Sequence, residues 1–355
     1  MEIKRKNTKI VKLGKVRIGG DNPIVVQSMI KNRLESTEAV KNEIINLQEC
    51  GCEVIRVAVP EHGSLKYVKS IMDSGVFKVP VVADIQFDHS IAIDSIKAGI
   101  DCIRINPGNI GSEEKIIKIV QAAKRHGSAI RIGVNSGSIN KIYLKNAGGN
   151  IIEAMASSAL DIVRLFESNE FFNFKISAKA SSVMDTISVY RILSSKIDYP
   201  LHLGVTEAGP MFSGAIKSSV GIGVLLYMGI GDTIRVSLTE RSTAEVKAAY
   251  TILSSLGLRK YGIDLISCPT CSRTVTDLKT AVKGIEELTY NVANNIKIAV
   301  MGCVVNGPGE AKDADIGIAY GKSKAAIFIK GKIIKRVDID LALEEFKKEL
   351  NRIII

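Results

Sequence analysis

Residues 102–135 read CIRINPGNIGSEEKIIKIVQAAKRHGSAIRIGVN, and this stretch contains the structural unit on which the chain is built. It begins and ends with β-branched runs, Cys102–Asn106 and Ala129–Val134, which predict buried strands. Between them, Glu113–Arg125 carries apolar residues at helical spacing. A strand, a helix and a second strand in this order predict a βαβ unit with parallel strands.

The same alternation continues through roughly the first 250 residues. The β-branched runs of this part are Pro23–Gln27, Val54–Val59, Val79–Asp84, Cys102–Asn106, Ala129–Val134, Lys175–Lys179, Leu201–Val205 and Thr233–Ser237. Eight strand–helix units in about 250 residues are typical of a (β/α)8, or TIM, barrel. A doubly wound sheet usually has a glycine-rich turn after its first strand, whereas Gly19-Gly20 precedes the first run here. The predicted fold is therefore α/β, with a TIM-barrel domain over residues 1–255.

The pattern changes from about residue 256 onward. A helix is predicted over Thr274–Leu288 and a buried strand over Asn295–Met301. Three short strands and a closing amphipathic helix follow at Ile316–Ala319, Ala325–Ile329, Lys332–Val337 and Leu341–Leu350. These elements predict a small α+β domain over residues 256–355.

Polar residues able to bind an anion or move a proton lie at or just after the ends of nearly all barrel strands. They are Arg56, Asp84, Arg104, Asn106, Arg131, Asn135, Lys179, Glu207, Arg235 and Ser237. Active sites of TIM barrels lie at the carboxyl ends of the strands, so these side chains are predicted to converge. Structural ion pairs with Asp84, Glu207 and Asp232 are one interpretation. The excess of arginines over acids favours a polyanionic ligand, because buried cations are costly without a partner.

Two loops after predicted strands support this interpretation. Asn106–Gly111 and Asn135–Ser138 are rich in Gly, Asn and Ser, which suit backbone N–H groups directed at phosphate oxygens. Each loop alone is also an ordinary strand-to-helix turn. Together with the arginines they predict a phosphate or diphosphate site.

A metal centre is predicted in the C-terminal domain. Cys268 and Cys271 form a CxxC pair, and Cys303 and Glu310 lie in MGCVVNGPGE at residues 301–310. Three thiolates are one short of the four that a structural zinc or an iron–sulfur cube usually has, and all four histidines lie in the barrel. Such a site suits a catalytic [4Fe–4S] cluster with one open iron. Glu310 is a candidate for a displaceable fourth ligand, although it could instead lie on a surface turn.

Composition limits the other classes of function. The net charge of +11 suits anionic substrates or an acidic electron carrier, and no nucleic-acid-binding motif accompanies it. No apolar run approaches the roughly 20 residues of a membrane span, and the N-terminus has no secretory pattern. Six cysteines without a secretory signal favour a reducing cytoplasm. We therefore expect neither a nucleic-acid nor a membrane partner.

The chain closely resembles the 4-hydroxy-3-methylbut-2-enyl diphosphate synthase family (IspG/GcpE) of the non-mevalonate isoprenoid pathway. The matching motifs are QSM at residues 27–29, IRVA at 55–58, RINPGN at 104–109, RIGVN at 131–135, LHLGVTEAG at 201–209, GDTIRVS at 231–237, CPTC at 268–271 and MGCVVNGPGE at 301–310. The resemblance spans most of the chain and implies the short bacterial form, a barrel followed by a cluster domain.

The resemblance also implies an activity. The family reductively opens and dehydroxylates 2-C-methyl-D-erythritol 2,4-cyclodiphosphate, using two electrons delivered through a [4Fe–4S] cluster by flavodoxin or ferredoxin. Its cluster ligands correspond to Cys268, Cys271, Cys303 and Glu310, and its diphosphate-binding residues to Arg56, Arg104, Arg131, Asn135 and Lys179, with Ser237 nearby. Glu207 matches a glutamate thought to help deliver a proton, which requires that burial keep its carboxyl group protonated. The family forms homodimers in which the cluster domain of one subunit caps the barrel of the other.

Two departures from the family pattern stand at the barrel mouth. Gln86 replaces the usual histidine in Asp-Ile-His-Phe, so an acid–base role at that position is in doubt. The loop Ile30–Leu34 lacks the usual Thr, Asn and Asp, so we expect it to pack differently around the substrate.

Two other functions remain open on the sequence alone. One is a non-redox barrel enzyme that acts on a phosphorylated substrate and has a zinc-stabilised C-terminal domain. The other is a cluster carrier or redox-sensing scaffold, which would bind no diphosphate tightly at its barrel.

Overall fold

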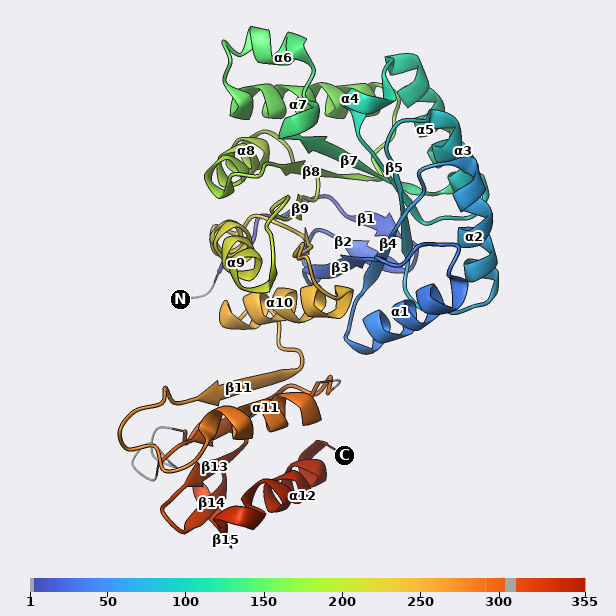
Figure 1. Cartoon of the computed structure of the whole chain (residues 1–355). Helices are drawn as coiled ribbons and strands as arrows, with labels where there is room; N and C mark the ends of the chain where they lie inside the picture. The colour runs from blue at the N-terminus through green and yellow to red at the C-terminus, as the bar shows by residue number, and fades with distance from the viewer. Residues whose placement is uncertain (1–2, 291, 304–310, 355) are drawn as a thin grey trace. The chain divides into compact units, whose positions relative to one another are not determined.

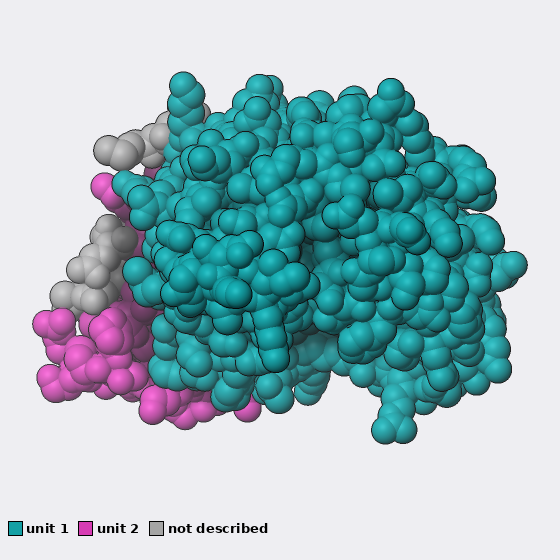
Figure 2. All heavy atoms as spheres, turned by 90° about the horizontal axis from the view of Figure 1, so that it is seen from above, with its two compact units in different colours: residues 1–259 teal, residues 260–355 magenta. Residues whose placement is uncertain are grey.

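The computed structural model describes residues 3–290, 292–303 and 311–354 of the chain. It divides into two compact units, Met1–Arg259 and Lys260–Ile355 (Figure 2). The first is an α/β unit and the second has a sheet of its own.

The first unit is a barrel of parallel strands, which confirms the predicted TIM-barrel fold (Figure 1). Its strands are β3 (Val25–Met29), β4 (Val54–Ala58), β5 (Val81–Ile85), β6 (Cys102–Ile105), β7 (Ala129–Asn135), β8 (Phe174–Lys179), β9 (His202–Leu203) and β10 (Thr233–Ile234). From β3 to β8 each strand pairs with the next in sequence, β9 pairs with β10, and β10 pairs with β3. A single parallel bridge between Ile176 and Leu201 connects β8 with the segment that leads into β9.

Helices follow the strands and lie around the outside of the barrel (Figure 1). They are α1 (Thr37–Glu49), α2 (His62–Asp73), α3 (His89–Lys97), α4 (Pro107–Ile110), α5 (Glu113–His126), α6 (Lys141–Asn146), α7 (Ile151–Ser168), α8 (Val183–Lys196), α9 (Met211–Tyr227) and α10 (Ser242–Ser255). Helix α5 shows why these segments form helices that cover the barrel. Ile116, Ile119 and Ala123 form its buried face, and Gly127, whose φ is +72°, caps its C-terminus.

An N-terminal β-hairpin, which the sequence patterns did not predict, lies beneath the barrel strands. It consists of β1 (Val11–Leu13) and β2 (Val16–Ile18). Its buried residues pack against side chains at the starts of five barrel strands: Val25, Val54, Val82, Cys102 and Ala129. Apolar side chains therefore fill the amino-terminal end of the barrel, and the polar residues lie toward the carboxyl ends of the strands.

The second unit is a five-stranded mixed sheet with two helices. In sheet order the strands are β11 (Ile263–Ser267), β12 (Ile296–Met301), β13 (Ile316–Tyr320), β14 (Lys324–Ile329) and β15 (Lys332–Asp338). Strands β11, β12 and β13 are parallel, whereas β14 and β15 pair antiparallel. The helices α11 (Leu278–Leu288) and α12 (Ala342–Ile354) contribute Ile285 and Phe346 to its core.

Helix α11 begins later than the sequence predicts, at Leu278 instead of Thr274. Asp277 caps it by accepting a hydrogen bond from the backbone N–H of Thr280 at 3.3 Å. The preceding residues belong to the cysteine loop, since Val275 N–H donates to the carbonyl oxygen of Gly302 at 3.1 Å. Within the described ranges, none of the helices has both the length and the apolar character that crossing a bilayer requires.

Candidate active site at the carboxyl ends of the barrel strands

Asp84, the fourth residue of β5, organises one side of the barrel mouth. Its carboxylate forms ion pairs with Arg56 of β4 at 2.6 Å and with Arg104 of β6 at 3.3 Å. Gln86 donates to the same carboxylate at 2.7 Å and accepts from Arg104 Nη1 at 3.2 Å. Burial alone would raise the pKa of Asp84, but Arg56, Arg104 and Arg131 together lower it. The carboxylate therefore stays ionised and fixes two guanidinium groups.

Arg131 and Lys179 bring further positive charge to this region. Arg131 of β7 is 2% exposed, and its Nε and Nη1 have no hydrogen-bond partner in the described part of the chain. Burial lowers the pKa of Arg131, and repulsion by Arg56 and Arg104 lowers it further. Burial also lowers the pKa of Lys179, followed by repulsion from Arg131 and Arg235. Such desolvated, mutually repelling cations are costly until an anion binds between them.

Two glycines make room for these cations. A Cβ at Gly133 would lie 2.3 Å from Arg104 Nε, and one at Gly204 would lie 2.4 Å from Lys179 Nζ. Both glycines therefore permit a close approach of a long basic side chain to the backbone. They stand inside the RIGVN and LHLGVTEAG motifs.

The two predicted anion-binding loops contact each other. Asn106 caps α4 by accepting from Gly108 N–H at 3.2 Å, and its amide nitrogen donates to Ser138 Oγ at 2.7 Å. Ser138 belongs to a 3₁₀ turn, Ser136–Ser138, that follows β7. The side-chain amide of Asn135 is oriented so that its nitrogen donates to the carbonyl oxygen of Val134 at 3.1 Å and its oxygen accepts from Arg104 Nη2 at 3.2 Å. The loops after β6 and β7 thus join the arginine cluster.

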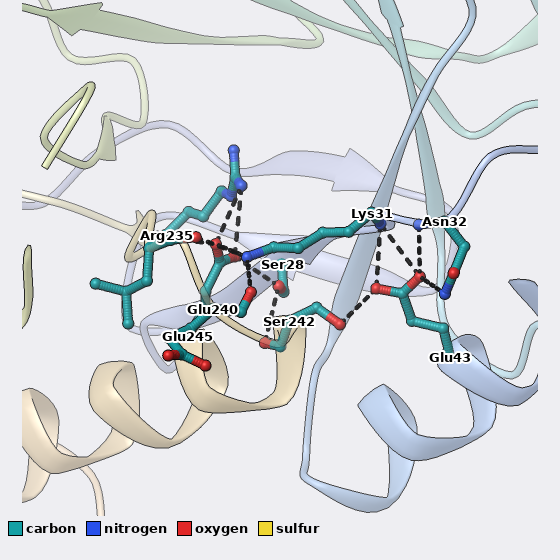
Figure 3. A network of polar contacts seen from close by, with 9 residues as sticks. Ser28, Lys31, Asn32, Glu43, Arg235, Glu240, Ser242 and Glu245 are labelled. Carbon is teal, nitrogen blue, oxygen red and sulfur yellow. Dashed lines mark hydrogen bonds and ion pairs between the residues drawn. The ribbon is translucent and has the colours of Figure 1, made fainter. Parts of the chain in front are cut away.

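Arg235 occupies a second network, which is built around a buried glutamate that the sequence interpretation missed (Figure 3). Glu245 of α10 is 1% exposed and lies 3.4 Å from Arg235 Nη2. Ser28 Oγ donates to Glu245 at 2.9 Å, and Lys31 Nζ lies 3.0 Å from it. The sequence signal for this residue was an acidic side chain in the first turn of the helix.

The remaining predicted residues differ in their surroundings. Glu207 is exposed, has a φ of +52°, and accepts a hydrogen bond from Ser181 Oγ at 3.1 Å. The predicted role as a proton donor requires that Glu207 be buried. The described residues of a single barrel do not bury it. Ser237 is half-buried and lies three residues beyond β10. In the atypical loop, Ile30 and Leu34 are buried, at 7% and 8% exposure.

The three predicted thiol ligands follow two neighbouring parallel strands of the second unit. Ser267 of β11 is paired with Val300 of β12, so Cys268 and Cys303 follow these strands at the same edge of the sheet. Gly302 N–H donates to Cys268 Sγ at 3.2 Å. Cys271 is exposed and lies between Cys268 and Thr274 in the loop after β11. Its backbone N–H donates a hydrogen bond to Thr274 Oγ1 at 3.1 Å.

These residues fit an iron–sulfur cluster. Thiolate ligands accept backbone N–H bonds in such sites, as Cys268 does here. The pKa of Cys271 is lowered, first by a backbone hydrogen bond from Arg273, which favours the thiolate form that binds metal. Among the described residues no three potential ligands are already grouped as a metal site. Glu310, the predicted fourth ligand, lies outside the described residues.

Comparison with known proteins matches both units to one family. The GcpE TIM-barrel domain matches residues 8–250, and the GcpE protein C-terminal domain matches residues 264–352. A protein of Caldanaerobacter subterraneus is 52% identical over 99% of this chain and 98% of its own length. A protein of Aquifex aeolicus is 49% identical over 98% of this chain and 97% of its own length. Both are named 4-hydroxy-3-methylbut-2-en-1-yl diphosphate synthase (flavodoxin).

Two solved structures align with part of the chain. Dihydropteroate synthase of Xanthomonas albilineans aligns with a TM-score of 0.51 at 13% identity, over 71% of this chain and 99% of that one. The Yersinia pestis dihydropteroate synthase gives a TM-score of 0.50 at 12% identity, over 70% and 98%. At this level of identity the likeness concerns the fold only.

Proposed function

The chain belongs to the GcpE family, and from this premise we propose that it converts 2-C-methyl-D-erythritol 2,4-cyclodiphosphate to 4-hydroxy-3-methylbut-2-enyl diphosphate. It is an enzyme of the non-mevalonate route to isoprenoids. The observation that carries the proposal is the excess of buried and half-buried cations at the barrel mouth. Arg56, Arg104, Arg131, Arg235 and Lys179 are accompanied there by only two ion-paired carboxylates within the described chain, those of Asp84 and Glu245. A diphosphate supplies the missing negative charge.

The substrate-binding residues that we assign follow from this arrangement. They are Arg56, Arg104, Asn106, Arg131, Asn135, Lys179, Arg235 and Ser237. The fixed positive charges of the arginines and of Lys179 lower the energy of the phosphate oxygen that is released when the ring opens, because these groups are already oriented before the reaction. Binding energy from the rest of the diphosphate positions the carbon skeleton. The Asp84 carboxylate contributes by holding Arg56 and Arg104 in place.

We assign Cys268, Cys271, Cys303 and Glu310 as ligands of a [4Fe–4S] cluster. When bound, such a cluster supplies single electrons and a Lewis-acidic iron site. The overall change takes up two electrons, breaks a C–O bond to phosphate and removes a hydroxyl group as water. Loss of water consumes a proton, and we assign Glu207 as its source. Glu207 is exposed in a single chain, so this role requires a covering element.

We propose a flavodoxin or a ferredoxin as the reductant. The relatives carry flavodoxin in their names, and a chain with a net charge of +11 suits an acidic carrier. We place the reaction in the cytoplasm, since the thiol ligands must stay reduced.

We further propose a homodimer whose active site spans two chains. Helix α9 supports a self-association surface, because Phe212, Ile216, Val220 and Val224 recur every four residues along it. All four are exposed, Phe212 by 82%. A contiguous apolar stripe of this kind is typical of a protein–protein interface. A partner subunit would also provide the cover that Glu207 requires.

The first test is anaerobic purification followed by measurement of iron, sulfide and the visible spectrum. We expect about four irons per chain, as a [4Fe–4S] cluster requires, and consumption of the cyclodiphosphate when a low-potential reductant is added. One zinc per chain, no colour and no turnover would overturn the proposal and favour a structural metal domain.

Two variants test the ligand assignments. Cys303→Ser is expected to lose the intact cluster and turnover, because a hydroxyl group replaces a thiolate ligand. Glu310→Ala is expected to keep a cluster and lose most of its activity. A brown, active Cys303→Ser protein would contradict the first assignment, and unchanged turnover in Glu310→Ala would contradict the second.

A further inference from the structure

Glu245 is buried at the start of α10 and receives hydrogen bonds or ion pairs from four groups. These groups are Ser28 Oγ at 2.9 Å, Lys31 Nζ at 3.0 Å, Leu238 N–H at 3.0 Å and Arg235 Nη2 at 3.4 Å. The carboxylate also lies in the first turn of the helix, where the helix dipole favours negative charge. It is therefore a satisfied anion at 1% exposure.

Arg235 depends on this anion. Burial lowers the pKa of Arg235; Glu245 opposes that effect, and the nearby Arg56 adds repulsion. Its Nη2 lies equally far, 3.4 Å, from both carboxylate oxygens of Glu245. Without Glu245, the guanidinium group of Arg235 would lose its carboxylate partner while the repulsion from Arg56 remained.

Glu245 also connects two loops at the barrel mouth (Figure 3). Lys31, in the loop after β3, reaches across to the carbonyl oxygens of Leu238 at 2.7 Å and of Glu240. Leu238 in turn donates its N–H to Glu245. The loop after β10, which begins with Arg235, is thereby fastened to the loop after β3. This contact gives the atypical Ile30–Leu34 loop a defined role.

We propose that Glu245 is a positioning residue that holds Arg235, through their ion pair and through Lys31, in the orientation that binds the substrate diphosphate. This inference rests on the proposed function, because it needs a diphosphate at the barrel mouth. Glu245 itself is 1% exposed and contacts only protein groups among the described residues, so in this proposal it acts through Arg235.

The test compares Glu245→Gln with wild type in the full-length protein. Inorganic diphosphate binding is measured by calorimetry, and KM and kcat are measured with the cyclodiphosphate. Because a charge-assisted contact to Arg235 is lost, we expect diphosphate affinity to fall at least about tenfold and KM to rise more than kcat falls. In an Arg235→Met background, Glu245→Gln is expected to have no further effect on affinity.

Glu43→Gln is the matched control. Glu43 of α1 accepts from the N–H groups of Lys31 and Asn32 at 3.1 Å and from Ser242 Oγ at 2.6 Å, but it does not contact Arg235. It is expected to lower thermal stability and leave diphosphate affinity within about twofold, since only the loop contact is weakened. An equal loss of affinity in both variants would assign Glu245 to general stability and overturn the proposal.

Two further outcomes separate the possible failures. Wild type that binds no diphosphate would overturn the proposed function, whereas wild type and Glu245→Gln binding it equally would overturn the positioning role alone. If Glu245→Gln does not fold because the Lys31 charge has lost its carboxylate partner, the double variant Glu245→Gln with Lys31→Met removes both charges. Its diphosphate affinity then decides: a loss of about tenfold or more supports the role, and wild-type affinity overturns it.

Discussion

Lys179 is the residue at which ligand binding and stability conflict most directly. It lies at the end of β8, and its amine is desolvated and repelled by four arginines. In the free protein this charge is a cost, and with a bound anion it becomes a favourable contact. Lys175, four residues earlier on the same face of the strand, is also buried, and its Nζ has no partner in the described chain. Substitution of Lys175 is therefore a suitable control for substitution of Lys179, because both are buried lysines of the same strand.

Lys179→Met is expected to raise the free energy of unfolding by roughly 1–4 kcal/mol and to weaken diphosphate binding at least about tenfold. Removing the cation relieves the repulsion but also removes the proposed contact with the diphosphate. Urea denaturation and calorimetry measure the two effects. Lys175→Met is expected to stabilise the protein with little effect on diphosphate affinity. Loss of stability in both variants would contradict the interpretation that these cations are uncompensated.

Lys175 also predicts a pH dependence. Burial lowers its pKa from the ordinary 10.5 to about 8. Below pH 8 both the folded and unfolded states hold the proton, so the folded state carries the full cost of the buried charge. Between pH 8 and 10.5 the folded state releases the proton first, and stability rises. The stability difference between Lys175→Met and wild type should therefore be largest near pH 7 and shrink toward pH 10. An unchanged difference would argue that Lys175 keeps its charge throughout.

At the scale of elements, two parallel strands bring the cysteines together. Strands β11 and β12 end at the same edge of their sheet, and the loops that follow them carry Cys268, Cys271 and Cys303. The loops touch at Gly302, whose carbonyl oxygen accepts from Val275 N–H and whose N–H donates to Cys268 Sγ. The spacing of the thiols thus depends on close packing at one glycine.

Gly302→Ala is expected to lower the iron and sulfide content by half or more without unfolding the domain. The new Cβ would lie 2.9 Å from Thr274 Cγ2 and 3.2 Å from Leu278 Cδ2, so the first cysteine loop must shift away. Metal analysis and far-UV circular dichroism measure the two effects. Gly284→Ala is the control, because its Cβ meets only a flexible leucine end, Leu343 Cδ2, at 3.3 Å. Full cluster content in Gly302→Ala would show that the loops tolerate the displacement.

At the scale of the whole molecule, the two units carry different parts of the proposed active site. The barrel unit holds the arginines and the lysine that cluster at the strand ends, and the second unit holds Cys268, Cys271 and Cys303, the cysteines that we propose as cluster ligands. The proposed substrate site and the proposed cluster ligands therefore lie in different units, so the proposed reaction requires that a barrel and a C-terminal domain meet, within a chain or between chains. The exposed stripe on α9 is our candidate for the surface that joins two chains.

Phe212→Glu is expected to convert the proposed dimer to a monomer and to lower turnover, because a charge in an apolar interface is desolvated without a partner. Sedimentation velocity measures the oligomeric state. Ile142→Glu, which places the same charge at another exposed apolar residue, on α6, is the control and should remain dimeric. A Phe212→Glu protein that is still dimeric would exclude α9 as the contact.

The sequence by itself determined the features that depend on neighbouring residues. Strand and helix periodicity located every barrel strand, since alternation and helical spacing are local properties. The polar residues at strand ends and the CxxC pair identified the candidate site for the same reason. The cluster ligands and the role of Glu207 stay predictions, and they came from motifs and resemblance.

Only the tertiary structure decided which charges meet. Glu245 contacts Lys31 and Ser28, which lie 214 and 217 residues earlier in the sequence. No local sequence pattern indicates contacts over such a separation. The β1–β2 hairpin escaped prediction because its strands are three residues each, and it is stabilised by the strand ends that it covers. The exposure of Glu207 likewise depends on what packs over it. These features rest on contacts between distant segments, which form only when the barrel closes.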